Sequence, residues 1–448
     1  MRTLRRLAGF VASHHPLEGG LLSKVWPFPA VVGATLSIAW ATEVAAFFIS
    51  RGLALAILAF LQVSPEFAVE AVLAKNAAQD PHQLQFVTAN FTGSNRLLVG
   101  AALPVIFLIG RRVLSRQGRW PGHLQISAHH AVEVIALTLP SVYSLIWVLR
   151  GGLGILDTVV LVGMFAGYLW LLSRMPAAEA EEVELLRGVP KRVMDTGNRS
   201  LQRTFAIGAF LLGGLVLLFA AEPFVEGMKS IGEFIHVPPY LLLQWIAPLL
   251  SEFPEFFTVV YWSRQASVEQ AFMNIVAAKI NQWTLLIAMI PLVFTITHLV
   301  RNSGGFTITF DYQQKIEILL TALQGLFAAA CMFKFRFLRW EAYALLGLWL
   351  FQLFDPVIDP YLQFLPSVFG GTTPAPELEK IIIREYTSIV FMALIVFELV
   401  RYRRHFRLFR SFADVWRRYG PGGSDRSGHG AQLGDTSVTG QARVSRES

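Results

Sequence analysis

Residues 61–67 read Leu-Gln-Val-Ser-Pro-Glu-Phe, and residues 90–95 read Asn-Phe-Thr-Gly-Ser-Asn. Both stretches lie inside apolar runs that are long enough to cross a bilayer. A carboxylate beside a proline and a cluster of small polar residues are costly in hydrocarbon unless something binds to them. The same layout returns as Leu-Ser-Glu-Phe-Pro-Glu-Phe at 250–256 and Asn-Ile-Val-Ala-Ala-Lys-Ile-Asn-Gln-Trp at 274–283. The repetition predicts one binding site built from two halves.

The composition indicates a helical membrane protein. Of 448 residues, 54% are hydrophobic and 15% are charged, whereas a soluble domain carries about 25% charged residues. The net charge is +7, and contact with anionic lipid explains it better than nucleic acid, because most basic residues lie between or after apolar runs. The single Cys331 excludes an internal disulfide and a thiolate metal cluster. No phosphate-binding Gly-Lys-Ser/Thr loop and no nucleophile with its base occurs, so we expect neither ATP drive nor an enzyme.

The spacing of the apolar runs predicts an all-α polytopic membrane protein. We expect two inverted five-helix repeats plus one extra C-terminal transmembrane helix, about eleven spans in all. Because five is odd, the second repeat enters the membrane from the side opposite to the first. The predicted parts are an interfacial N-terminal segment, the first repeat, a cytoplasmic connection, the second repeat, the extra span with its preceding loop, and a basic then disordered tail, at residues 1–27, 28–173, 174–203, 204–355, 356–403 and 404–448.

The connections predict the orientation in the cell membrane. Lys and Arg gather in alternate connections, which places the N-terminus outside and the C-terminus in the cytoplasm. The basic residues within 2–24 favour the opposite orientation. Residues 223–239, rich in Glu, Gly and Pro, are expected to form a polar insertion on the outer side, and the Gly/Ser-rich tail from Gly420 is expected to be disordered.

The two halves align when Glu66 is set against Glu255. A proline before each glutamate breaks its helix and frees backbone carbonyls. Oxygen ligands of this kind suit Na⁺, Ca²⁺ or Mg²⁺, and buried carboxylates also carry protons. Helical spacing adds candidate cation ligands on the same faces, namely Gln62 in the first half and Ser251 and Glu252 in the second.

Other polar residues leave two interpretations open. Asn90 and Asn274 occupy matching places and are either cation ligands or amides that pair helices. Glu43 and Glu222 also match, and are either gate residues or solvated span ends. For Glu70, one helical turn after Glu66, we expect a solvated helix end rather than a residue that lines the cytoplasmic or outer pathway.

The motifs resemble those of the sodium/calcium exchanger superfamily of cation antiporters. The resemblance rests on Ser64-Pro65-Glu66 with Gly93-Ser94-Asn95, and on Phe253-Pro254-Glu255 with Ala277-Ala278-Lys279. It implies a ten-helix core that works by alternating access, in which Glu66, Ser94 and Glu255 hold the cation.

The second half departs from the family's pattern. Where the family often has Asn or Asp, Gln282 offers only an amide, and Lys279 stands in place of an Asn. A lysine in mid-membrane needs a partner, and Glu252 or Glu255 is expected to provide it, so that Lys279 modulates the charge of the site.

The resulting hypothesis is a secondary active antiporter that exchanges Ca²⁺ or another cation for H⁺ or Na⁺. It needs no cofactor besides the transported ions, and its partners are inorganic cations and the bilayer. Two alternatives remain open: a monovalent Na⁺/H⁺ antiporter on the same scaffold, and a non-transporting membrane protein with a degenerate second repeat. The sequence leaves the oligomeric state open.

Overall fold

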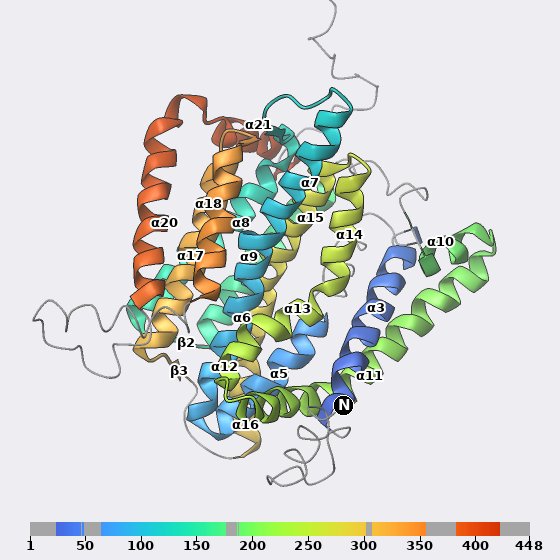
Figure 1. The fold of residues 1–448 in the computed structure, drawn as a ribbon, viewed down its shortest axis with the longest axis vertical. Coiled ribbons are helices and arrows are strands. Elements are labelled where there is room, and N and C mark those ends of the chain that lie inside the picture. The colour runs from blue at the N-terminus through green and yellow to red at the C-terminus, as the bar shows by residue number, and fades with distance from the viewer. Residues whose placement is uncertain are drawn as a thin grey trace, which may run out of the picture.

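The computed structural model describes residues 24–45, 47–48, 64–175, 186, 188–301, 307–354 and 382–421, and these are mostly helical (Figure 1). In the first half the elements are α3 (Pro27–Ala45), α5 (Ser64–Gln79), η1 (Pro81–Gln83), α6 (Leu84–Leu97), η2 (Leu98–Ala102), α7 (Leu103–Arg116), β1 (Leu124–Gln125), η3 (Ala128–His130), α8 (Ala131–Arg150), β2 (Gly152–Leu153) and α9 (Ile155–Arg174).

The second half repeats this order of elements. It comprises α10 (Gly188–Asp195), α11 (Arg199–Phe234), α12 (Pro239–Leu241), η5 (Leu242–Ile246), α13 (Ala247–Ser251), α14 (Phe253–Arg264), α15 (Val268–Asn281), η6 (Gln282–Leu286), α16 (Ile287–Val300), β3 (Ile308–Thr309), α17 (Tyr312–Met332), β4 (Arg336–Phe337) and α18 (Arg339–Leu353). After it come α20 (Ile382–Arg401), η7 (Arg403–His405) and α21 (Leu408–Tyr419).

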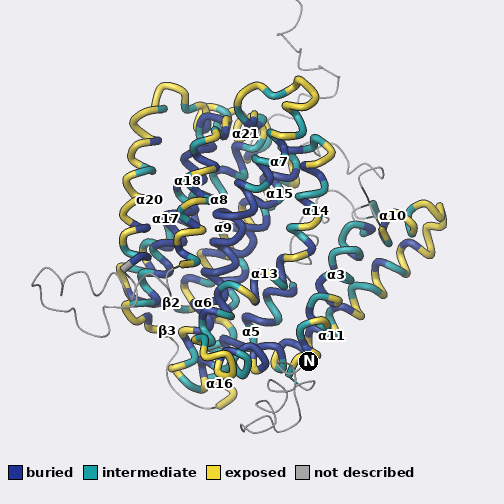
Figure 2. The backbone as a smooth tube through the Cα atoms, in the orientation of Figure 1, coloured by how far each residue is buried: buried dark blue, intermediate teal, exposed yellow. Residues whose placement is uncertain are grey.

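The predicted all-α membrane architecture is confirmed. Among the described residues, seven helices are long and apolar enough to cross a membrane: Pro27–Ala45, Pro81–Arg116, Ala128–Arg150, Ile155–Arg174, Arg199–Phe234, Val268–Val300 and Tyr312–Met332. Buried residues gather in the middle of the bundle, and its outer helices carry exposed side chains (Figure 2). Large apolar side chains such as Leu149 and Leu218 are 86% and 77% exposed, as expected for groups that face lipid. The total of eleven spans stays a prediction.

The short strand pairs show how the halves are related. β1 pairs with β4, and β2 pairs with β3, both antiparallel. Because α8 runs from the β1 end to the β2 end, the two pairs lie at opposite ends of the bundle. By chain order β3 is the counterpart of β1, and β4 is the counterpart of β2. Exchanging the halves therefore exchanges the two ends, which is the property of an inverted repeat.

A π-helical turn interrupts the polar span of each half at the same place. The turn η2 begins at Leu98 and η6 begins at Gln282, eight residues after Asn90 (98 − 90) and eight after Asn274 (282 − 274). A π-turn inserts a residue and is frequent at functional sites. The shared offset supports the alignment of Asn90 with Asn274.

One prediction about a polar segment is wrong. The helix α11 continues through Pro223 to Phe234, so much of the expected insertion at 223–239 is helical. Phe224, Val225 and Met228 recur on one helical face and are buried, so packing outweighs the unfavourable composition. The predicted basic segment that begins at residue 404 contains the helix α21, whose Leu408 and Val415 pack into the core. Residues 422–448 lie outside the described part of the chain.

Candidate functional site

Two helices begin with a proline and a glutamate near the middle of the bundle. α5 opens with Ser64-Pro65-Glu66, and α14 opens with Phe253-Pro254-Glu255. A proline in the first turn loses no intrahelical hydrogen bond, because the first amide groups of a helix have no partner within it. In α14, which follows the break at Glu252, the proline therefore starts the helix rather than bends it. Each glutamate lies in a first turn, where the helix dipole favours negative charge.

Glu66 makes its polar contacts with the other half of the molecule. Its side chain is 3% exposed and lies beside Ser251 and Glu252, at the break between α13 and α14. Glu252 is also buried and accepts a hydrogen bond from Nε2 of Gln282. The partly exposed Glu255 lies close enough to Glu66 and Glu43 for their carboxylates to repel one another. The inverted halves thus bring these predicted site residues together.

The clustered carboxylates require a compensating positive charge. Carboxylates in contact inside a membrane domain stay ionised together only when a cation lies between them, and otherwise some of them bind protons. Glu66 Oε1 and Gln282 Oε1 are buried and have no hydrogen-bond partner among the described residues. Carboxylate, hydroxyl and amide oxygens are ligands that Ca²⁺ prefers. The arrangement is therefore suited to binding a cation or protons in turn.

The polar side chains of residues 90–95 form hydrogen bonds within α6 and between α6 and α5. Asn90 Nδ2 donates to Glu70 Oε2 at 2.7 Å, which makes it an amide that pairs α6 with α5. Ser94 Oγ donates to the Asn90 carbonyl at 3.1 Å, and Asn95 Nδ2 donates to the Phe91 carbonyl at 2.7 Å. Glu70 is fully buried, so the expectation of a solvated helix end is wrong. The reason is that α5 is covered by α6, α11 and α16.

Gly93 allows two backbones to meet. A Cβ at this position would lie 1.9 Å from the carbonyl oxygen of Gln244 in η5. Only glycine lets α6 approach that closely. The Gly-Ser-Asn cluster is therefore explained, in part, by the crossing of α6 with the span that carries Ser251 and Glu252.

Lys279 does not reach the carboxylates. Its side chain is 1% exposed, and its Nζ lies 4.0 Å from the centre of the Trp283 ring. Among the described residues this Nζ has no hydrogen-bond partner, and no carboxylate there forms an ion pair with it. The expected pairing with Glu252 or Glu255 is wrong, because its position on α15 turns the side chain toward Gly325 of α17 and the Trp283 ring.

Of the remaining predicted residues, Glu43 lies near Glu255, and Glu222 lies on the surface of the bundle. Glu222 is exposed and forms a 3.6 Å ion pair with Lys75 of α5. Glu43 and Asn274 are partly exposed. Gln62 lies outside the residues that the structure describes.

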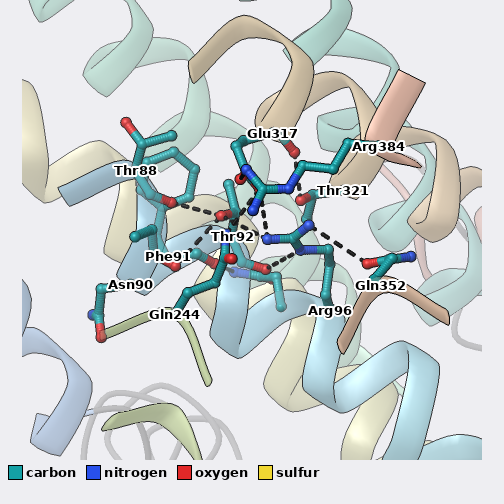
Figure 3. Close-up of polar contacts among 12 residues, drawn as sticks. Thr88, Asn90, Phe91, Thr92, Arg96, Gln244, Glu317, Thr321, Gln352 and Arg384 are labelled. Atoms are coloured by element: carbon teal, nitrogen blue, oxygen red, sulfur yellow. Dashed lines mark hydrogen bonds and ion pairs between the residues drawn. The ribbon is translucent and has the colours of Figure 1, made fainter. Parts of the chain in front are cut away.

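The sequence reasoning missed a buried charge network between α6, α17 and α20 (Figure 3). Glu317 Oε2 lies 2.6 Å from Nη2 of Arg96, and Glu317 Oε1 forms a second ion pair with Arg384. Gln244 Nε2 donates to Glu317 Oε2 at 2.9 Å, and Arg96 Nη1 donates to Gln352 Oε1 at 3.5 Å. All five side chains are buried. A charged residue inside a predicted transmembrane span is the sequence signal that could have indicated this network.

A second buried cluster joins the other end of α20 to α17 and α18. Lys334 Nζ lies 2.6 Å from Glu341 Oε1 and 3.0 Å from Glu398 Oε2. Cys331 lies beside these carboxylates, so the group has ligand types that metals use. Because the lysine ammonium already binds both carboxylates, the arrangement fits a structural ion pair better than a metal centre.

A family model matches this chain in two stretches, one in each half. The family model described as sodium/calcium exchanger protein matches residues 28–174 and 205–354. The crystal structure of the H⁺/Ca²⁺ exchanger CAX superposes with a TM-score of 0.74 and 29% identity, over 93% of this chain and 95% of that one. A structure of the sodium-calcium exchanger NCX_Mj, soaked with 100 mM Na⁺ and 10 mM Sr²⁺, gives a TM-score of 0.47 and 15% identity, over 74% and 97%.

A search of curated proteins found no match. The family match nevertheless covers both repeats and therefore more than half of the chain. Proteins of that family are transporters and not enzymes. The chain is a multi-pass membrane protein that belongs to the sodium/calcium exchanger family.

Proposed function

We propose that this protein is a secondary active antiporter that exchanges Ca²⁺ for H⁺ by alternating access. The observation that carries the proposal is the contact between Glu66 of one half and Glu252 of the other, beside Glu255. Ca²⁺ neutralises two carboxylates at once, and protons neutralise them singly, so the two can replace each other in one site. The similarity to a structure described as an H⁺/Ca²⁺ exchanger supports the same pair of ions.

The ligands would come from both halves of the repeat. Glu66, Glu252 and Glu255 supply carboxylates, Ser251 supplies a hydroxyl, and Gln282 supplies its buried Oε1. Because the ligands belong to α5, the α13–α14 break and η6, a relative movement of these elements opens and closes the site. α3 packs along α11 on one side of the bundle (Figure 1), and sliding of this helix pair would expose the site to either side in turn.

The distribution of charge supports an orientation in the cell membrane. Basic residues gather at the β1–β4 end, where α7 finishes with Arg116, β4 carries Arg336 and α21 lies close to α8. The positive-inside rule would place that end, together with the C-terminus, in the cytoplasm.

Transport into proteoliposomes tests the function directly. Purified protein in liposomes should take up radiolabelled Ca²⁺ when a pH gradient is imposed, and collapse of the gradient with an ionophore should stop the uptake. Uptake that is driven by a Na⁺ gradient instead would show that the counter-ion is Na⁺ and not H⁺. Proton flux that responds to Na⁺ and ignores Ca²⁺ would establish the monovalent antiporter, and the absence of any flux would contradict transport.

A further inference from the structure

The helix α20 lies outside the two repeats that the family model matches, yet its Arg384 is buried in the membrane domain. It pairs with Glu317 of α17, which also pairs with Arg96 of α6 (Figure 3). Buried ion pairs in general contribute little net stability, so stability alone does not explain why this one is present.

The network holds a π-turn against α6 at two consecutive residues. Glu317 accepts the hydrogen bond of Gln244 at 2.9 Å, and the Arg96 guanidinium lies 5.2 Å from the centre of the Trp245 ring. Both residues belong to η5. At the same place the backbone of Gly93 touches the Gln244 carbonyl. Charge, hydrogen bonding and close packing therefore all act on one helix crossing.

This crossing is joined directly to the candidate cation site. Gln244 precedes Glu252 by eight residues (252 − 244), and only the short helix α13 separates η5 from the break that presents Ser251 and Glu252 to Glu66. A change in how η5 sits on α6 would move those ligands relative to Glu66. The affinity of an oxygen site for Ca²⁺ depends on such ligand positions.

We propose that Glu317 is a positioning residue for cation binding, and that Arg384 of α20 holds it in place. The pair fixes η5 on α6 and thereby sets the spacing between the two halves of the site. This inference rests on the proposed function, because the affected ligand is the transported cation. In this proposal α20 influences cation binding through the Arg384–Glu317 ion pair and does not itself contact the ions.

The test compares two variants on the same helix. Arg384→Met removes the charge that holds Glu317 and leaves the Arg96–Glu317 pair intact. Glu398→Gln breaks the ion pair with Lys334 at the other end of α20, and serves as the matched control. Initial rates of radiolabelled Ca²⁺ uptake into proteoliposomes, measured over a range of Ca²⁺ concentrations, give KM and the maximal rate separately.

For Arg384→Met we expect KM for Ca²⁺ to rise about tenfold while the maximal rate changes less than about twofold, because the ligands remain but lose their spacing. Arg384→Lys should recover most of the affinity, since a lysine still supplies the charge. Glu398→Gln should lower thermal stability without changing KM. An equal rise of KM in both variants, or none in Arg384→Met, would overturn the proposal.

A distance measurement tests the same idea without transport. In a Cys331→Ser background, spin labels at Gln85 on α6 and Leu249 on α13, both exposed, report the crossing by electron–electron resonance. The distance distribution should shift or broaden with Arg384→Met and stay unchanged with Glu398→Gln. A parent protein that shows no Ca²⁺ uptake but passes this test would refute the proposed function alone, whereas an unchanged distribution in Arg384→Met would refute the inference.

Discussion

The starts of α5 and α14 have the same backbone plan and different chemistry. Both helices place a glutamate directly after a proline in the first turn. One turn later, the first half has the buried Glu70 and the second half has the buried Val259. Glu66 is 3% exposed, whereas Glu255 is partly exposed and has Glu252 just before its helix.

The neighbouring spans differ in a similar way. Gly93 corresponds to Ala277, and Asn95 corresponds to Lys279. The symmetry of the fold thus brings two proline–glutamate turns together, while the side chains around them make the halves unequal. Equal halves would present the same ligands to both sides of the membrane. Under the alternating access proposed above, unequal halves would allow the two directions of access to differ in affinity.

The largest effect is expected from removing one carboxylate from each half. The double variant Glu66→Gln/Glu255→Gln keeps side-chain size and removes two ligand charges, and Ca²⁺ affinity depends strongly on ligand charge. We expect uptake of radiolabelled Ca²⁺ to fall about a hundredfold or more. Glu226→Gln, on the exposed face of α11, is the control and should leave uptake unchanged. Retained uptake in the double variant would show that the cation binds elsewhere.

The next comparison exchanges the small residues of the two polar spans. Gly93→Ala places a Cβ 1.9 Å from the Gln244 carbonyl oxygen and must shift the helix crossing. Overpacking of this kind costs about 2 kcal/mol. Ala277→Gly only adds backbone freedom and should cost about 1 kcal/mol. Thermal unfolding in detergent measures both, and a smaller loss for Gly93→Ala than for Ala277→Gly would contradict the close crossing.

Glu70 provides a third comparison, since Val259 replaces it in the other half. Glu70→Ala leaves the Asn90 amide without its acceptor, which costs about 1–2 kcal/mol when the amide is buried. Glu70→Gln keeps an acceptor oxygen and should recover most of this stability. Chemical denaturation distinguishes the two variants, and equal losses would indicate that Asn90 does not depend on the hydrogen bond.

The smallest effect is expected at Lys279. Lys279→Met removes the contact with Trp283 and also removes a buried charge that no carboxylate among the described residues pairs with. A cation–π contact contributes about 0.5–2 kcal/mol, and relief of desolvation offsets it, so the unfolding temperature should change little. Destabilisation as large as that caused by breaking a buried ion pair, about 3–5 kcal/mol, would reveal a carboxylate partner after all.

Much of the site could be predicted from local pattern. Apolar runs predict the membrane architecture, and the repeated proline–glutamate pairs predict Glu66 and Glu255 as residues of the candidate site. Glu252, Ser251 and Gln282 were also predicted, and the structure places them beside Glu66 or each other. Such signals are readable because hydropathy and helical spacing depend only on nearby residues.

Other features could not be read along the chain. Residues 223–234 look polar by composition, yet Phe224, Val225 and Met228 find a core to pack against, and the helix continues. The direction of Lys279 and the burial of Glu70 depend on which helices cover them. None of these outcomes is set by neighbours in sequence.

The sequence by itself determined a membrane protein of two related halves with a carboxylate after a proline in each. Only the tertiary structure decided that Glu66 meets Ser251 and Glu252, and that Arg96, Glu317 and Arg384 meet behind them. The physical reason is that a helix sets the spacing of its own side chains, whereas contacts between residues far apart in the chain depend on how the helices cross. That crossing rests on Gly93, a residue whose role is to have no side chain.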